Sequence, residues 1–192
     1  KYDITVTGAL ASDPHHFYRN NILLKHRNKK VGFTEPVRYR LVEFDKCWIM
    51  SPAINEFTAF LRTLSLSSIN RINIREGDDG ELIVGFAMFK KSAPLGFTAQ
   101  DIRKYGGKVK CVLVNARLSS GEDMLHYTIH GIKYLFSSNS FFQTNVHQLE
   151  NILTFFRDTL ALTGTETVVD LHAGVGTIGL FLAQYARRVY GV

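Results

Sequence analysis

The segment at residues 168–179 constrains the fold of this chain more than any other. It reads Val-Val-Asp-Leu-His-Ala-Gly-Val-Gly-Thr-Ile-Gly, an apolar run that ends in an acid, followed by two glycines one residue apart. A helical pattern begins directly afterwards. The segment therefore predicts a strand, a tight glycine turn and a helix start, which together form the first half of a nucleotide-type βαβ unit. Glycines in such a turn let a ligand approach the backbone closely.

Two ligand classes compete for this turn, and a turn that binds nothing is the third possibility. Gly174, Gly176 and Gly179 have the G-x-G-x-x-G spacing of dinucleotide-binding turns. Asp170, however, ends the strand four residues before the first glycine, and an acid is poorly suited to lie beside a pyrophosphate. An acid there suits a cationic or hydroxyl-rich ligand. The D-x-x-x-G-x-G pattern resembles the first motif of S-adenosylmethionine methyltransferases, which we favour.

Composition limits the class of protein. The chain has 192 residues, of which 45% are hydrophobic and 21% charged, as in soluble globular proteins. No apolar run reaches the roughly 18–20 residues that span a bilayer, and the N-terminus lacks a signal-peptide pattern. Two cysteines provide no disulfide framework. We therefore expect a cytoplasmic protein without a membrane partner, and the sequence predicts no obligate protein partner.

Positive charge is concentrated at the start of the chain. The net charge is +6, and residues 1–40 hold eight Lys or Arg against three acids, a balance of 8 − 3 = +5. Aromatic residues such as Phe17, Tyr18, Phe33 and Tyr39 are interspersed among these charges. A basic, aromatic segment resembles a nucleic-acid-binding surface, but an ordinary solvated strand face has the same composition, so both interpretations stay open.

The rest of the pattern predicts two domains. Strand-like segments rich in β-branched and aromatic residues fill the first two thirds, and helical spacing occurs at residues 52–64. We expect an α+β domain over residues 1–139 and the start of an α/β Rossmann-like methyltransferase domain over residues 140–192. The expected strands are residues 18–27, 30–34, 39–44, 68–75, 81–90, 108–117 and 125–136 in the first domain, and 167–171 and 188–192 in the second.

The second domain is expected to be incomplete. It has a helix that Asn145 caps, with Gln148 three residues later, and a second helix over about residues 177–185. Parallel sheets need several βα units to cover both of their faces. Two parallel strands and two helices fall short of this, so we expect the chain to be a fragment.

A second motif lies at residues 140–145, Ser-Phe-Phe-Gln-Thr-Asn, just before the capped helix. The aromatic rings could stack on a base, and Gln143 could bind an amino acid or a base edge, or the motif could be a hydrophobic plug with a helix cap. This motif, followed about 25 residues later by the Asp170 turn, resembles the RNA uracil-5-methyltransferases that act on tRNA and 23S rRNA. Upstream residues extend the resemblance over roughly residues 17–192, through Tyr18-Arg19-Asn20, Val31-Gly32-Phe33, Cys47 before Pro52, and Gly131-x-x-Tyr134.

The resemblance implies a mechanism. A cysteine thiolate adds to carbon 6 of uracil, carbon 5 takes the methyl group of S-adenosylmethionine, and a base then removes the carbon 5 proton. The target base is expected to flip out of its stack. By resemblance, Gln143, His172 and Thr177 contact the cofactor together with Asp170, Gly174 and Gly176, although His172 departs from the aromatic or aliphatic residue usual there. Phe141 falls near the target base, and Arg19, Lys25 and Arg27 are the candidate RNA-binding residues.

Neither cysteine matches the nucleophile of the family, which lies with the catalytic carboxylate in a C-terminal half that this chain lacks. No catalytic residue is therefore expected among the 192 residues. Cys111 lies in an apolar run that predicts a buried, inert thiol. Cys47 matches, by resemblance, the last ligand of a [4Fe–4S] cluster in the rRNA subgroup, although Trp48 follows it instead of the common proline. Four thiolates hold such a cluster, so this chain alone could not.

A histidine pair adds no second metal site. His126 and His130 are expected on one strand, where residues four apart are separated by roughly 13 Å, too far to bind one ion. The sequence thus predicts part of an S-adenosylmethionine-dependent RNA uracil-5-methyltransferase, with 23S rRNA favoured over tRNA and the chain by itself inactive. A nicotinamide-dependent oxidoreductase and a non-catalytic RNA-binding module remain as alternatives.

Overall fold

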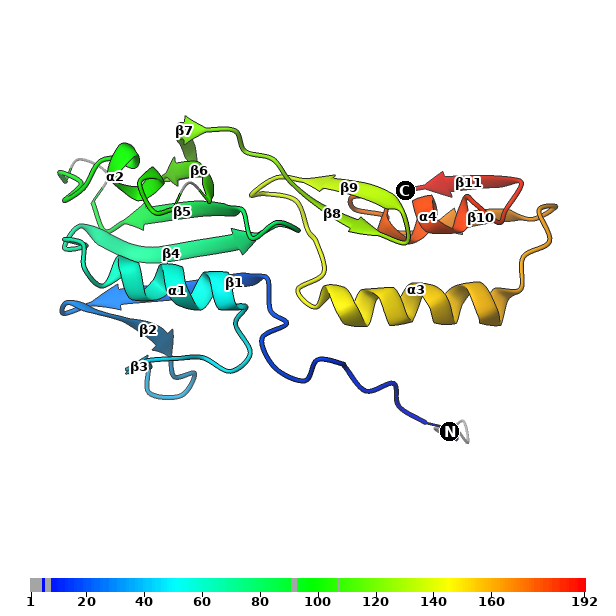
Figure 1. Ribbon diagram of the computed structural model, residues 1–192, viewed down its shortest axis with the longest axis horizontal. Coiled ribbons are helices and arrows are strands. Elements are labelled where there is room, and N and C mark those ends of the chain that lie inside the picture. Colours follow the sequence, from blue (N-terminus) through cyan, green and yellow to red (C-terminus); the bar gives the residue numbers. More distant parts are fainter. Residues whose placement is uncertain (1–4, 6–7, 91–92, 107) are drawn as a thin grey trace.

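The computed structural model has two lobes that lie side by side (Figure 1). It describes residues 5, 8–90, 93–106 and 108–192, so Lys1 and Asp3 of the basic segment lie outside the described residues. The larger lobe is a seven-stranded sheet with two helices, and the smaller lobe contains a β-hairpin, a long helix and a two-stranded parallel sheet. No helix in the described ranges is both long and apolar enough to cross a membrane.

The large sheet has the strand order β3-β2-β1-β4-β5-β6-β7. Its neighbouring strands are antiparallel except β5 and β6, which run parallel because the helix α2 (Ala99–Arg103) connects them. The strands are β1 (Asn21–Arg27), β2 (Lys30–Thr34), β3 (Leu41–Glu43), β4 (Ile69–Glu76), β5 (Leu82–Met88), β6 (Val109–Val114) and β7 (Arg117–Gly121).

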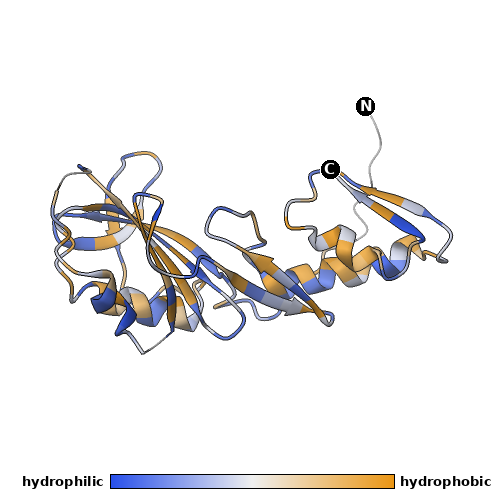
Figure 2. Cartoon of the chain, turned by 90° about the horizontal axis from the view of Figure 1, so that it is seen from above, coloured by the Kyte–Doolittle hydropathy of each residue, from blue (hydrophilic) through white to orange (hydrophobic). Residues whose placement is uncertain are grey.

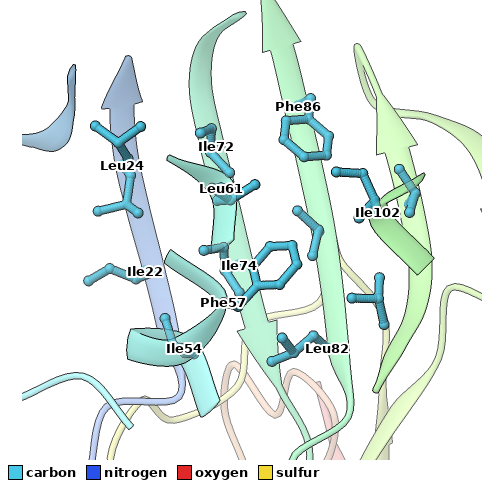
Figure 3. Close-up of a cluster of buried hydrophobic side chains, with 14 of the residues drawn as sticks. Ile22, Leu24, Ile54, Phe57, Leu61, Ile72, Ile74, Leu82, Phe86 and Ile102 are labelled. Atoms are coloured by element: carbon cyan, nitrogen blue, oxygen red, sulfur yellow. The ribbon is translucent and has the colours of Figure 1, made fainter. Parts of the chain in front are cut away.

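One face of this sheet carries the first hydrophobic core. Helix α1 (Pro52–Leu61) begins where the Ser51 side chain accepts a hydrogen bond from the Ile54 amide at 3.2 Å, with proline in the first turn. Its apolar stripe, which includes Phe57 and Leu61 at 0% exposure, packs on side chains of β1, β4 and β5 (Figure 3). Ile102 of α2 joins the same core, so both helices cover the same face.

The opposite face, called here the outer face, carries the alternate residues of each strand. Lys25 on β1 lies opposite Arg71 on β4, and Leu23 lies opposite Asn73. These residues are displaced by one position from the buried residues of the first core, which places them on the other side of the pleat. The outer face is therefore basic and amide-rich, with some apolar surface between the polar groups.

The smaller lobe begins with the hairpin β8 (Leu125–Ile129) and β9 (Ile132–Phe136) and continues through helix α3 (Val146–Leu160). Phe136, Leu149 and Phe181 belong to a second core, which also includes residues of β5 and β6 such as Cys111. The smaller lobe therefore packs against one end of the sheet. Figure 2 shows apolar segments, in orange, along the strands of both lobes.

The chain ends in a β-α-β unit. β10 (Thr167–Asp170) and β11 (Arg188–Gly191) are parallel, with Asp170 opposite Gly191, and α4 (Thr177–Leu182) connects them. A Cβ atom on Gly179 would lie 3.0 Å from an Asp170 carboxylate oxygen and 3.4 Å from a Val189 methyl carbon. The third glycine of the motif thus lets the helix approach the strands closely.

Most expected elements are found within a few residues of their predicted bounds. The mixed sheet with few helices fits the α+β class expected for the first part of the chain, and the parallel β10–β11 pair fits the α/β unit expected at its end. The division after residue 139 stays a prediction. The second core contains residues from both sides of that position.

Two of the expected strands had wrong bounds, and two elements were not predicted. Residues 125–136 form a hairpin instead of one strand, because His130 and Gly131 turn the chain with φ angles of 48° and 78°. The strand expected to reach residue 117 ends at Val114, since Asn115 and Ala116 also have positive φ. Strand β7 and helix α2 were not predicted: β7 is mostly exposed and lacks apolar alternation, and α2 has only five residues.

Candidate functional site

The segment at residues 137–144, which contains the start of the Ser-Phe-Phe-Gln-Thr-Asn motif, is fastened to the large sheet by Arg75 of β4. The Arg75 guanidinium donates from Nη1 to the carbonyl oxygens of Ser137, Ser138 and Ser140 at 2.6, 3.1 and 2.6 Å. It also lies over the Phe136 ring at 5.2 Å and is only 4% exposed. Burial lowers the pKa of Arg75, and the nearby Asp123 carboxylate opposes this shift.

Two further residues hold this segment in place. Asn20 donates from its side chain to the Gln143 carbonyl and from its backbone to the Thr144 carbonyl, each at 3.1 Å. The Asp123 carboxylate accepts from the amide and the hydroxyl of Ser138 at 2.8 and 2.7 Å. The segment is thus fixed at several points along its backbone. Its side chains between those points are free to contact a ligand.

The two phenylalanines of the motif have different roles. Phe142 is 3% exposed and stacks on Phe136 with ring centroids 4.5 Å apart, so it is part of the second core. Phe141 is 72% exposed. Gln143 is also exposed, and the Asn145 side chain accepts from the Gln148 amide at 3.0 Å to cap α3 as expected. Phe141 and Gln143 are therefore the motif side chains available to a ligand.

The glycine turn after β10 has the backbone that its sequence predicts. Gly174 and Gly176 have φ angles of 58° and 79°, a region that favours glycine. Asp170 accepts a hydrogen bond from the Gly179 amide at 2.9 Å, so its carboxylate also fastens the start of α4. Asp170 and Gly176 line a hollow of about 240 Å³ beside β11.

The remaining predicted cofactor residues lie on the same turn. His172 is exposed and has a φ angle of 62°, which is uncommon for a residue with a side chain. Thr177 begins α4 and is half-buried. The structure thus brings Asp170, His172, Gly174, Gly176 and Thr177 together at one edge of the parallel sheet. Gln143 precedes α3 in the sequence, whereas the glycine turn follows it. Gln143 is not among the residues that line the hollow.

The predicted RNA-binding residues fall in two places. Arg19 pairs with Met50 on one side and with Asn145 on the other, so it lies next to the segment that carries Gln143. Lys25 and Arg27 lie on the outer face of β1, in a hollow of about 590 Å³ that Tyr39 also lines. Phe141 lines a different hollow on the same face of the sheet.

The two cysteines have different surroundings. Cys111 is fully buried, and burial raises the pKa of its thiol to about 11. Cys47 is half-buried, and the Asn55 side chain holds both its backbone amide and its carbonyl, at 2.9 and 3.0 Å. Among the described residues, no group of three or more His, Cys, Asp and Glu side chains could hold a metal ion.

The histidine pair lies on two different parts of the hairpin. His126 is in β8, and His130 is in the turn, with its ring nitrogen 3.3 Å from the Thr154 hydroxyl on α3. The expectation that one strand carries both residues is therefore corrected, and the spacing argument drawn from it no longer applies.

The anchoring residues were missed by the sequence reasoning. The alternation of β4 places Arg75 on the outer face, where an arginine is normally solvated, and only the fold shows that the 137–144 segment covers it. Asn20 lies 123 residues before Gln143 and was noted only within an upstream motif, and Asp123 lies 15 residues before Ser138. Nothing in the local sequence indicated that either side chain would hold this segment.

The chain thus combines two features. One is a strand–glycine turn–helix unit with an acid at the strand end, and the other is an anchored segment that presents an aromatic ring and an amide. No family model matches the chain. Similar curated proteins are uncharacterized RNA methyltransferases of Halalkalibacterium halodurans, 29% identical over 189 aligned residues, and of Enterococcus faecalis, 28% identical over 213. These alignments cover 84% and 94% of this chain but 41% and 46% of the relatives.

A solved structure shares the fold. The tRNA (uracil-54, C5)-methyltransferase of Pyrococcus abyssi, in complex with S-adenosyl-L-homocysteine, matches with a TM-score of 0.69 and 22% identity, over 88% of this chain and 46% of that one. The chain therefore spans about half the length of the proteins it resembles. The resemblance to RNA methyltransferases that the motifs predicted is confirmed by the curated relatives, and the solved structure shows that the fold is shared.

Proposed function

We propose that the protein takes part in S-adenosylmethionine-dependent methylation of carbon 5 of a uridine in structured RNA, with 23S rRNA ahead of tRNA. The observation that carries the proposal is the glycine turn, where positive-φ glycines follow Asp170 at the carboxyl edge of a parallel strand pair. Ligands of open α/β sheets bind at this edge. The names of the curated relatives support methyl transfer to RNA over hydride transfer to a dinucleotide.

In this proposal the turn binds the cofactor and the anchored segment meets the RNA. The carboxylate of Asp170 and the backbone at Gly174 and Gly176 hold S-adenosylmethionine, with Gln143, His172 and Thr177 around it. Phe141, with its ring exposed, stacks against the target base. The methyl group and the sulfonium that releases it are supplied by the cofactor.

A [4Fe–4S] cluster with Cys47 as one ligand remains a proposal for the longer protein, on the resemblance alone.

The nucleophile is not assigned among the described residues, because the thiol of Cys111 is buried and Cys47 matches, by resemblance, a cluster ligand and not the nucleophile. We accordingly expect the 192 residues by themselves to transfer no methyl group to RNA. Turnover of labelled S-adenosylmethionine by this chain alone would contradict that expectation.

Calorimetric titration with S-adenosylmethionine tests the cofactor site. Asp170→Asn keeps an oxygen that can accept from the Gly179 amide but removes the charge. It should raise the dissociation constant about tenfold, since a charge-assisted hydrogen bond contributes roughly 1.5–3 kcal/mol. Gln143→Ala should weaken binding without changing the melting temperature. Wild-type affinity in both variants, or equal binding of a nicotinamide dinucleotide, would end the proposal.

Salt dependence tests the basic segment. If Arg19, Lys25 and Arg27 contact phosphates, neutralising all three should weaken RNA binding. The slope of log affinity against log salt should fall by about 0.7–0.9 for each lost contact. Lys133 on β9 is exposed and lies outside the proposed surface, so Lys133→Gln is the matched control. An unchanged slope would show that these side chains only solvate a strand.

A further inference from the structure

A hollow of about 420 Å³ lies on the outer face beside Phe141. Its floor is formed by β1, β4 and β5, and one wall is the anchored segment at residues 138–144. That volume falls in the range of pockets that bind small ligands. The hollow shares no lining residue with the one at the glycine turn, so it is a separate place on the molecule.

The side chains of this hollow combine three kinds of group. Asn73 donates to the Asn21 side chain and to the Ile22 carbonyl, both at 3.2 Å, so two amides lie side by side on the floor. Leu23 is 50% exposed and provides an apolar patch between the amides. Arg71 supplies an exposed guanidinium, and no acidic residue lines the hollow.

We propose that this hollow binds a second, unpaired nucleobase of the same RNA strand, next to the base that Phe141 contacts. Unstacked bases of single-stranded RNA are recognised by amides that bind their hydrogen-bonding edges and by aromatic rings or guanidinium planes on which they stack. Asn21 and Asn73 supply the edge contacts, Leu23 and Arg71 the stacking surface, and the charge of Arg71 favours a nearby phosphate. The inference rests on the proposed function, because it takes RNA as the ligand.

The fixed backbone around the hollow supports this assignment. Arg75 holds the wall segment at three carbonyls, and the Asn73 bonds hold the floor, so the hollow exists before any ligand arrives. A preformed site loses little conformational entropy on binding. Contacts to base edges carry sequence information, whereas contacts to phosphates do not. The amide pair should therefore affect which RNA binds, and Arg71 should affect how strongly any RNA binds.

Fluorescence anisotropy with labelled oligo(U), oligo(A) and oligo(C) decamers tests the proposal, using the full protein. Arg71→Gln should weaken all three by about fivefold and lower the salt slope by somewhat under one unit, on the order of 0.7. Asn73→Ala should change the ratio of the dissociation constants among the decamers by threefold or more. Leu23→Ala should weaken all three by about threefold. Lys133→Gln, which removes one charge outside the hollow, is the matched control.

Thermal melts identify variants that fail to fold, and Asn73→Ser provides a second, smaller change at the same amide position. The proposal would be overturned if all the hollow variants had affinities and ratios within twofold of wild type. It would also be overturned if the wild-type protein bound none of the decamers. Methyl transfer to RNA is measured separately. An active enzyme whose hollow variants bind as wild type refutes the second-base site alone. RNA binding that depends on the hollow, without any methyl transfer, refutes the proposed reaction instead.

Discussion

The two lobes differ in how completely their apolar residues are covered. In the large sheet, the side chains that face α1 and α2, such as Ile72 and Ile74, are fully buried, and polar residues occupy the other face. In the parallel pair at the end of the chain, Val169 is 56% exposed and Tyr190 49%. Antiparallel and mixed sheets with one polar face are stable with one face solvated, whereas strands of parallel sheets are apolar on both sides.

This difference locates the stability and the chemistry in separate places. The large sheet supplies a well-packed scaffold. Arg75 on β4 and Asn20, just before β1, fasten the segment that presents Phe141. The glycine turn lies on the unit whose apolar residues are less covered within these 192 residues. The proposed cofactor residues and the well-packed scaffold are thus on different parts of the described structure.

The largest expected difference between the lobes is in the free energy of unfolding when one leucine in each lobe is changed to alanine. Leu61 on α1 is fully buried, and Leu180 on α4 is 50% exposed. Leu61→Ala should lower the free energy of unfolding by about 2–5 kcal/mol, because it leaves a cavity. Leu180→Ala should lower it by less than about 1 kcal/mol. Urea denaturation measures both, and equal losses would contradict the comparison between the lobes.

A somewhat smaller effect is expected where the lobes are joined. Arg75→Met removes the donor for three carbonyls and should lower the free energy of unfolding by about 2–3 kcal/mol, since hydrogen bonds from charged groups are stronger than neutral ones. Limited proteolysis should also cleave the chain faster at residues 137–144. Arg103→Met is the control, because Arg103 is exposed and donates only to the Ser120 hydroxyl. Wild-type resistance to proteolysis in Arg75→Met would show that other contacts suffice.

The fold was predictable where one local pattern decided the structure. The Asp170 turn, the Asn145 cap and the apolar stripe of α1 were each read from a few adjacent residues, and the structure has all three. The hairpin at His130 was missed because histidine and glycine between two β-rich runs gave a weaker turn signal than the strand propensity around them. Local patterns thus predicted elements better than the bends between them.

The candidate site was predictable only in part, for a physical reason. The glycine turn is a local feature, and the sequence contained all of it. The anchoring of residues 137–144 depends on Arg75, 62 residues before Ser137, and on Asn20, 123 residues before Gln143. Which strands lie beside that segment is decided by the packing of the whole sheet. Similarly, the hollow beside Phe141 exists only because β1 and β4 are neighbours.

The N-caps of α2 and α3 allow a further comparison of the lobes, with a smaller expected change in the free energy of unfolding. Thr98 caps α2 on the large sheet, and its hydroxyl accepts from the Asp101 amide at 3.1 Å. Asn145 caps α3 and also donates to the Ser12 hydroxyl at 2.8 Å. Each change to alanine should lower the free energy of unfolding by about 1 kcal/mol. The larger loss is expected at Asn145, because its two bonds are part-buried, whereas the two bonds of Thr98, to the amide and the carboxylate of Asp101, are exposed. Thermal melts of both variants measure this, and a larger loss at Thr98 would contradict the assignment.

The smallest expected effect concerns the junction itself and depends on pH. Burial raises the pKa of the Glu76 carboxyl at the end of β4, against weaker opposing effects from the Ser51 hydroxyl and the Lys108 charge. A carboxyl with a higher pKa in the folded protein than in the unfolded chain binds its proton more tightly when folded. Its stabilising contribution is complete below the unfolded pKa and is lost as the pH rises through the raised pKa.

Glu76→Gln is uncharged at every pH and should remove this loss. At pH 7 it should raise the melting temperature slightly, because the wild-type carboxylate is then charged in a partly buried place. Below the unfolded pKa of a glutamate the variant and the wild type should melt together, because the wild-type carboxyl is then protonated too. Glu43→Gln, at an exposed ion pair with Lys30, is the control and should change little. A lower melting temperature for Glu76→Gln at pH 7 would mean that the attraction of Lys108 outweighs burial, and that the junction is held by charge instead of packing.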